Sequence, residues 1–148
     1  MKTFKDILLA KENFIKRRDE FLELNHQFYL NLIKQIGEKG NILKSGLLKY
    51  KSGTRDNINI VEEWIELNDD ESCTMQIGII VDQISHDVDL STYKQKSELK
   101  LIITINRETK KFEFDLTEQK PDEINFDEVV NYIFEELSYY YEKWTFEK

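Results

Sequence analysis

The chain has 148 residues, enough for one well-buried core and too few for two substantial domains. Hydrophobic residues make up 40% and charged residues 34%, a balance typical of a folded globule. No apolar run approaches the roughly 18 residues of a membrane span, and the N-terminus lacks the apolar segment of a secretory signal. The single cysteine, Cys73, can form no internal disulfide. We therefore expect a cytoplasmic protein with no membrane contact.

The charge is distributed unevenly along the chain. Residues 1–50 contain 10 Lys and Arg against 6 Asp and Glu, whereas residues 51–148 contain 11 against 23. The acidic part would repel a phosphate backbone, which argues against direct nucleic-acid binding. It would attract a basic protein and accelerate association with it, so we expect a basic protein partner.

Residues 1–37 are predicted to form one long helix, because residues 4–36 contain neither Gly nor Pro. At about 1.5 Å per residue, this helix is roughly 50 Å long and exceeds the roughly 40 Å width of a compact domain of this size. It should overhang its domain or meet another chain. Apolar residues recur every seven positions, which favours a supercoil with another helix of this chain or of a second copy. The residues predicted to form such a contact are Phe14, Ile15, Phe21, Leu22 and Phe28.

Residues 42–117 are predicted to form a five-stranded antiparallel meander, because apolar residues there alternate with polar ones. The second strand changes phase between Ile60 and Val61, which indicates a bulge. We expect a polar connection over residues 85–97. The predicted strands are residues 42–50, 57–67, 73–84, 98–106 and 112–116.

A C-terminal helix is predicted within residues 125–147. Asn125 followed by Glu128 matches a capping box, and apolar residues then recur at helical spacing. The predicted fold is therefore a single α+β domain over residues 1–148, in which a long helix, an antiparallel sheet and a C-terminal helix packed on the sheet follow one another.

Motifs for catalysis and cofactor binding are sparse. No glycine-rich phosphate loop and no nucleophile motif occurs, and the only histidines are His26 and His86. His86 lies near Asp82, Asp87 and Asp89, a set that could hold a divalent cation but lacks the spacing of a calcium loop. A polar loop rich in aspartate is the favoured interpretation, and we expect no cofactor or metal.

One enzymatic alternative stays open. Asp82 near the end of one predicted strand and Glu98 and Lys100 at the start of the next resemble the pattern of the PD-(D/E)xK nucleases. The resemblance implies a metal held by Asp82 and Glu98, with Lys100 beside it. The acidic charge of this part of the chain opposes DNA binding.

Aromatic residues among carboxylates give the main indication of a binding surface. Tyr132 and Tyr139 fall on a common side of the C-terminal helix, away from its apolar stripe, and tyrosine and tryptophan dominate binding hot spots. Packing of these rings under the long helix is an equally good interpretation. The predicted partner-binding residues are Trp64, Asp69, Asp70, Glu71, Tyr132, Glu135, Glu136, Tyr139, Glu142 and Trp144.

These observations favour a non-enzymatic, acidic protein-binding module. Immunity proteins that neutralise toxins, and phage-encoded inhibitors of nucleic-acid-handling proteins, share these bulk properties. Two alternatives remain: a homo-oligomeric structural or chaperone-like protein that pairs through its long helix, and the metal-dependent nuclease.

Overall fold

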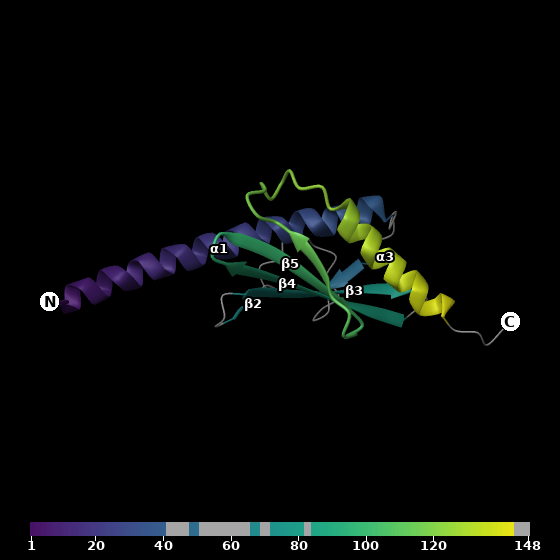
Figure 1. The fold of residues 1–148 in the computed structure, drawn as a ribbon, viewed down its shortest axis with the longest axis horizontal. Coiled ribbons are helices and arrows are strands. Elements are labelled where there is room, and N and C mark those ends of the chain that lie inside the picture. The colour runs from purple at the N-terminus through teal and green to yellow at the C-terminus, as the bar shows by residue number, and fades with distance from the viewer. Residues whose placement is uncertain (41–47, 51–65, 69–71, 82–83, 144–148) are drawn as a thin grey trace.

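The structure is a computed structural model that describes residues 1–40, 48–50, 66–68, 72–81 and 84–143 (Figure 1). It confirms the predicted α+β fold, with a long helix, an antiparallel sheet and a C-terminal helix in that order. The elements are α1 (Phe4–Lys39), β1 (Leu48–Tyr50), β2 (Glu66–Leu67), β3 (Ser72–Val81), β4 (Ile84–Gln95), β5 (Glu98–Ile105), β6 (Phe112–Asp115) and α3 (Asp127–Glu142).

The strands from β3 to β6 pair consecutively as an antiparallel meander. The short strands β1 and β2 both pair with the edge of β3 that faces away from β4. β1 lies beside residues 77–79 and β2 beside residues 73–74. The predicted bulge at Ile60 and Val61 lies outside the described residues.

The prediction of a polar connection over residues 85–97 is wrong, because residues 84–95 form β4, the strand that joins β3 to β5. The inward-facing residues of β4 are His86, Val88, Leu90 and Thr92. Only two of these four are aliphatic, so the alternation of apolar and polar residues is hard to see in the sequence. The strand is buried because its neighbours on both sides supply apolar side chains.

One face of the sheet carries the core, and both helices cover that face. Successive strands align apolar residues in rows, as where Met75 pairs with Leu90 and Leu90 with Ile103. α3 packs on the C-terminal part of α1 and on β5. The helix residues buried in this core are Phe28, Tyr29, Leu32, Ile33 and Ile36 of α1 and Val129, Val130, Ile133 and Leu137 of α3.

α1 begins at Phe4, and Thr3 is its N-cap residue: the Asp6 carboxylate accepts a hydrogen bond of 2.8 Å from the Thr3 backbone N–H. Of the two glycines expected to end the helix, Gly37 lies within it, and the helix runs on to Lys39 with Gly40 as its C-cap. One glycine weakens a helix by about 1 kcal/mol relative to alanine but does not end it when the next turn is held in place. The Lys39 ammonium, bound to Asn125 and Asp127, holds that turn.

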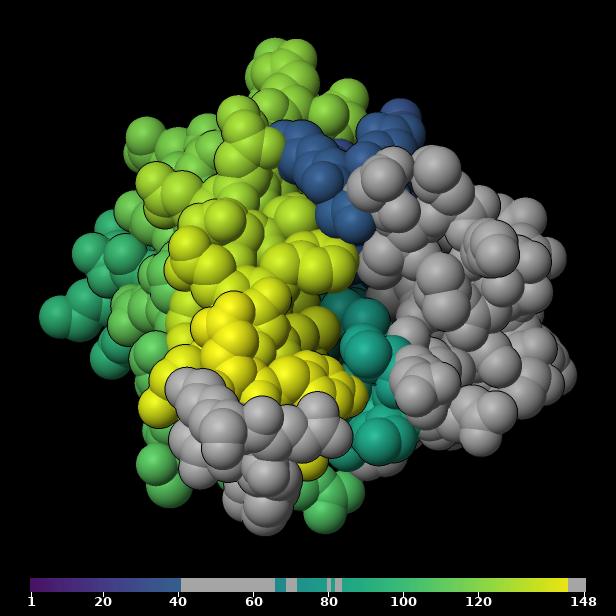
Figure 2. Space-filling view, turned by 90° about the vertical axis from the view of Figure 1, so that its right-hand side faces the viewer, coloured from purple at the N-terminus to yellow at the C-terminus, as the bar shows by residue number. Residues whose placement is uncertain are grey.

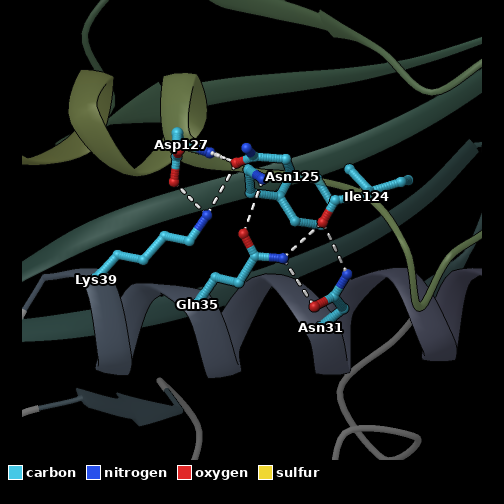
Figure 3. A network of polar contacts seen from close by, with 7 residues as sticks. Asn31, Gln35, Lys39, Ile124, Asn125 and Asp127 are labelled. Atoms are coloured by element: carbon cyan, nitrogen blue, oxygen red, sulfur yellow. Dashed lines mark hydrogen bonds and ion pairs between the residues drawn. The ribbon is translucent and has the colours of Figure 1, made fainter.

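A polar network joins α1 to the loop that precedes α3 (Figure 3). The Gln35 side-chain amide donates to the Ile124 carbonyl at 2.7 Å, and its oxygen accepts from the Phe126 N–H at 2.8 Å. Asn31 donates to the carbonyls of Pro121 and Ile124 at 2.7 and 3.2 Å. The two amides thus satisfy backbone groups of a loop that has no sheet or helix partner for them.

The start of α3 is held by the next turn of α1. Asn125 accepts a hydrogen bond from the Asp127 N–H at 2.8 Å. The predicted capping box of Asn125 and Glu128 is wrong, because Phe126 is the N-cap residue of α3. Lys39 donates to Asn125 at 2.9 Å and forms an ion pair with Asp127. These bonds fix the position from which α3 leaves the loop.

We predict that Gln35→Ala lowers the free energy of unfolding by about 2 kcal/mol, because it leaves the buried Phe126 N–H without an acceptor. Urea unfolding measures this. The control is Lys34→Ala, which truncates the exposed preceding residue and should change the stability by less than about 0.5 kcal/mol. Equal effects of the two substitutions would contradict a special role for the Gln35 amide.

We also predict a pH-dependent effect at Asp127, whose pKa is held below its ordinary value by Lys39 and then by Asn125. A carboxylate with a depressed pKa in the folded state stabilises the fold above its unfolded-state pKa of about 4, and this contribution is lost as the pH falls through the folded value. Asp127→Asn should therefore lower the melting temperature at pH 6, and the deficit should shrink below about pH 4. Asp122→Asn, in the same loop and exposed, should show no such trend.

Candidate protein-binding surfaces

The outward side of α3 carries three carboxylates at seven-residue spacing, Glu128, Glu135 and Glu142, and Tyr139 lies among them with 59% of its surface exposed. No Lys or Arg occurs within α3. Among the described residues, no cation forms an ion pair with these three carboxylates. We call Glu128, Glu135, Tyr139 and Glu142 the acidic ridge. α3 lies on the surface at the end of the molecule that faces the viewer in Figure 2.

Other predicted residues of α3 are engaged within the chain. Glu136 pairs with Lys110 at 2.6 Å, and Tyr132 stacks on Phe112 with ring centroids 4.5 Å apart. Lys110 also lies 5.7 Å from the centre of the Tyr132 ring. Burial of Tyr132 raises the pKa of its hydroxyl. Tyr132 is therefore half-buried on β6, and the structure does not bring it into one exposed surface with Tyr139.

The C-terminal end of α3 is attached to the sheet through His86, which is 2% exposed. The Asn106 amide donates to His86 Nδ1 at 2.9 Å, while its oxygen accepts from the Asp87 N–H. His86 Nε2 then carries the proton and donates to the Tyr141 hydroxyl at 2.6 Å. Tyr140 packs against the same imidazole, with ring centroids 5.0 Å apart. Both ring nitrogens of His86 have protein partners, which gives this histidine a structural role.

The aspartate cluster expected around His86 does not assemble as a cation site. Because side chains alternate along β4, His86 faces the core and Asp87 and Asp89 face the other side of the sheet. Asp82 lies outside the described residues. Within the part of the chain that the structure describes, no group of three or more potential ligands converges to hold a metal.

Of the residues that resemble a nuclease motif, the structure describes Glu98 and Lys100. Val81, which precedes Asp82, pairs with Ile84 at one end of that strand, and Glu98 pairs with Gln95 at the other end. The two ends of β4 are about 36 Å apart at 3.3 Å per residue. Lys100 pairs with Asp115 at 3.5 Å.

Cys73 has no exposed surface, and burial raises the pKa of its thiol to about 11. Its side chain lies on the core face of β3, in the row of Thr92 and Leu101. A thiol that stays protonated at neutral pH is a poor nucleophile.

A second surface is the N-terminal half of α1, which projects beyond the sheet in Figure 1. Its large apolar side chains are exposed, among them Phe4 at 72%, Ile7 at 61% and Phe14 at 56%. Of the predicted helix-pairing residues, Phe14 is thus exposed, Ile15, Phe21 and Leu22 are half-buried, and Phe28 is buried in the core of its own chain. We call residues 4–22 the overhang.

Several predicted partner-binding residues lie outside the described residues, namely Trp64, Asp69, Asp70, Glu71 and Trp144.

A hollow of about 690 Å³ lies where the end of α1 meets the start of α3. Lys39 and Asp127, which line it, are paired with each other, and Phe134 closes over Gly40. A Cβ on Gly40 would overlap the Phe134 ring and the Ile36 carbonyl oxygen. The sequence shows only that two glycines end the helical run, so this close packing could not be predicted from it.

Comparisons of the sequence with protein-family models and with curated proteins, and of the fold with solved structures, found no match. Neither described helix combines the length and apolarity needed to cross a membrane.

We predict opposite effects of alanine at the two glycines near the end of α1. Gly37→Ala should stabilise the protein by about 0.5 to 1 kcal/mol, because the residue is helical and a Cβ there meets nothing. Gly40→Ala should destabilise it by about 1 to 3 kcal/mol, because Phe134 must move. Thermal unfolding of both variants tests the pair, and a shift of the same sign would contradict the packing described at Gly40.

Proposed function

We propose that the protein is a non-enzymatic binding module that sequesters a basic protein in the cytoplasm, as inhibitors and immunity-type proteins do. The observation that supports this proposal is the acidic ridge. Three carboxylates without a cationic partner among the described residues lie along one side of α3, and two of them, Glu135 and Glu142, flank Tyr139, which is more than half exposed. This combination suits an arginine- or lysine-bearing surface, because a cation can pair with the carboxylates and lie over the ring.

The chain itself contains examples of the contact that the ridge would make with a partner. Lys110 lies over Tyr132 while it pairs with Glu136, and Lys143 lies 5.2 Å from the centre of the Tyr140 ring. Tyr139 has no such cation among the described residues. A partner cation at Tyr139, with Glu135 and Glu142 one helical turn away on either side, would reproduce the arrangement at Tyr132 between two chains.

The charge of the rest of the chain supports the same class of partner. The excess of acidic over basic residues in residues 51–148 attracts a basic protein over a distance and increases its association rate. Proteins that handle nucleic acids carry such basic surfaces, which places them among the candidate partners.

We expect a basic protein to be captured by this chain from the native cell. Its affinity for the triple variant Glu128→Gln, Glu135→Gln, Glu142→Gln should be at least tenfold lower than its affinity for the unmodified protein. The reason is that the charge-assisted contacts at the ridge are lost. Calorimetry with the purified partner at about 0.05 and 0.5 M salt measures the affinity, which should be weaker at high salt.

The matched control is Glu98→Gln, Glu113→Gln, Glu118→Gln, which removes the same charge from three exposed positions outside α3. It should weaken binding much less than the ridge variant does. Equal losses would mean that net charge alone is recognised, and a captured partner without a basic surface would contradict the proposal.

A further inference from the structure

The apolar stripe that the sheet buries on the C-terminal half of α1 continues onto the overhang. Phe28 and Tyr29 are 2% and 1% exposed. Steps of seven residues toward the N-terminus lead from Phe28 through Phe21 and Phe14 to Ile7, and from Tyr29 through Leu22 and Ile15 to Leu8. Exposure increases along both columns, to 61% at Ile7 and 47% at Leu8. The same side of the helix is therefore core at one end and exposed surface at the other.

We infer that the overhang is covered by the overhang of a second copy of this chain, in an antiparallel pair whose two-fold axis passes near Ile15. Such an interface is self-complementary and closed. Ile15 of each copy meets its counterpart, and Leu8 of one copy lies level with Leu22 of the other. The strict seven-residue repeat suits the shallow crossing of two helices.

Two cations within the stripe favour the antiparallel direction. Lys11 follows Ile7 by four residues and precedes Phe14 by three, and Arg18 repeats this position one heptad later, so both lie on the apolar side. In a parallel pair in register, each cation would lie level with the same cation of the other copy. With the axis near Ile15, Arg18 lies level with Glu12 of the second copy, and Lys11 with Asp19.

The charge of the sheet and α3, which we call the body of the molecule, also favours the antiparallel direction. The overhang projects from one end of the molecule, and the sheet and α3 lie toward the other end (Figure 1). A parallel pair would place two bodies that both carry an acidic excess side by side, whereas an antiparallel pair places them at opposite ends of the paired helices. This separation exceeds the roughly 8 Å over which charges interact in physiological salt.

Sedimentation of the full chain from about 1 to 100 µM tests the second copy. We expect a dimer that Phe14→Glu converts to a monomer, because Phe14 is exposed in the single chain and its replacement leaves the core intact. The control, Asn13→Glu, adds the same charge at the exposed neighbouring position, on the polar side of the helix, and should leave the dimer unchanged. A chain that stays monomeric over this range overturns the inference, because the apolar stripe is then not covered by a second copy.

Pulsed electron spin resonance with a nitroxide at Lys5→Cys tests the direction, since the native Cys73 is buried. Antiparallel helices with the axis at Ile15 separate the two labels by about 30 Å, whereas a parallel pair in register leaves them about 10 Å apart. The shorter distance would overturn the antiparallel arrangement. A dimer that Phe14→Glu leaves intact would show that the copies meet elsewhere, and would also overturn it.

A charge exchange tests the register independently. Arg18→Glu should weaken the dimer, and addition of Glu12→Arg should restore it, because the exchanged pair again has opposite signs. Failure of the second substitution to restore association would contradict the axis at Ile15. None of these positions lies on α3, so loss of dimerisation and loss of partner binding are separately measurable.

Discussion

The apolar stripe on α1 is longer than the sheet that covers it, and the arrangement of the molecule depends on this mismatch. Where the sheet lies beneath the helix, Phe28, Leu32 and Ile36 enter the core and are almost fully buried. The helix does not end where the sheet does, because residues 4–22 contain no Gly or Pro and the Asp6 carboxylate secures the first turn. Helical propensity and capping thus keep an apolar surface ordered beyond the body.

The buried half of α1 also determines how α3 is presented. Gln35 satisfies the backbone of residues 124 and 126, and Lys39 holds Asn125 and Asp127, so the helix begins at a defined rotation. Its apolar side then faces the sheet, and its far end is held by the bond between Tyr141 and His86. The ridge carboxylates point outward as a consequence of this attachment at both ends. A surface held in this way loses little conformational freedom on binding a partner.

The helices and most strands could be predicted because their periods persist over many residues. β4 could not be predicted, because its inward positions include the polar residues His86 and Thr92. The His86 imidazole binds Tyr141 and the Thr92 hydroxyl binds Asn25, and these partners are close only in the folded chain. Tyr132 and Tyr139 are seven residues apart and look equivalent in the sequence, yet Phe112 lies beneath only the first. In each case the missing information is a contact between distant segments, which periodicity within one segment does not contain.

The two proposed surfaces, the overhang and the acidic ridge, are coupled through the negative charge of the molecule. Because the overhang and α3 lie at different ends of the molecule, pairing of overhangs would leave both acidic ridges uncovered (Figure 1). The negative charge proposed to attract a basic partner would also repel a second body, and this repulsion is smallest when the helices pair in opposite directions. Charge on the body would thus select the arrangement in which a dimer presents two separate ridges. Two ridges on one particle would increase the apparent affinity for a partner with repeated basic surfaces, without any change at the ridge itself.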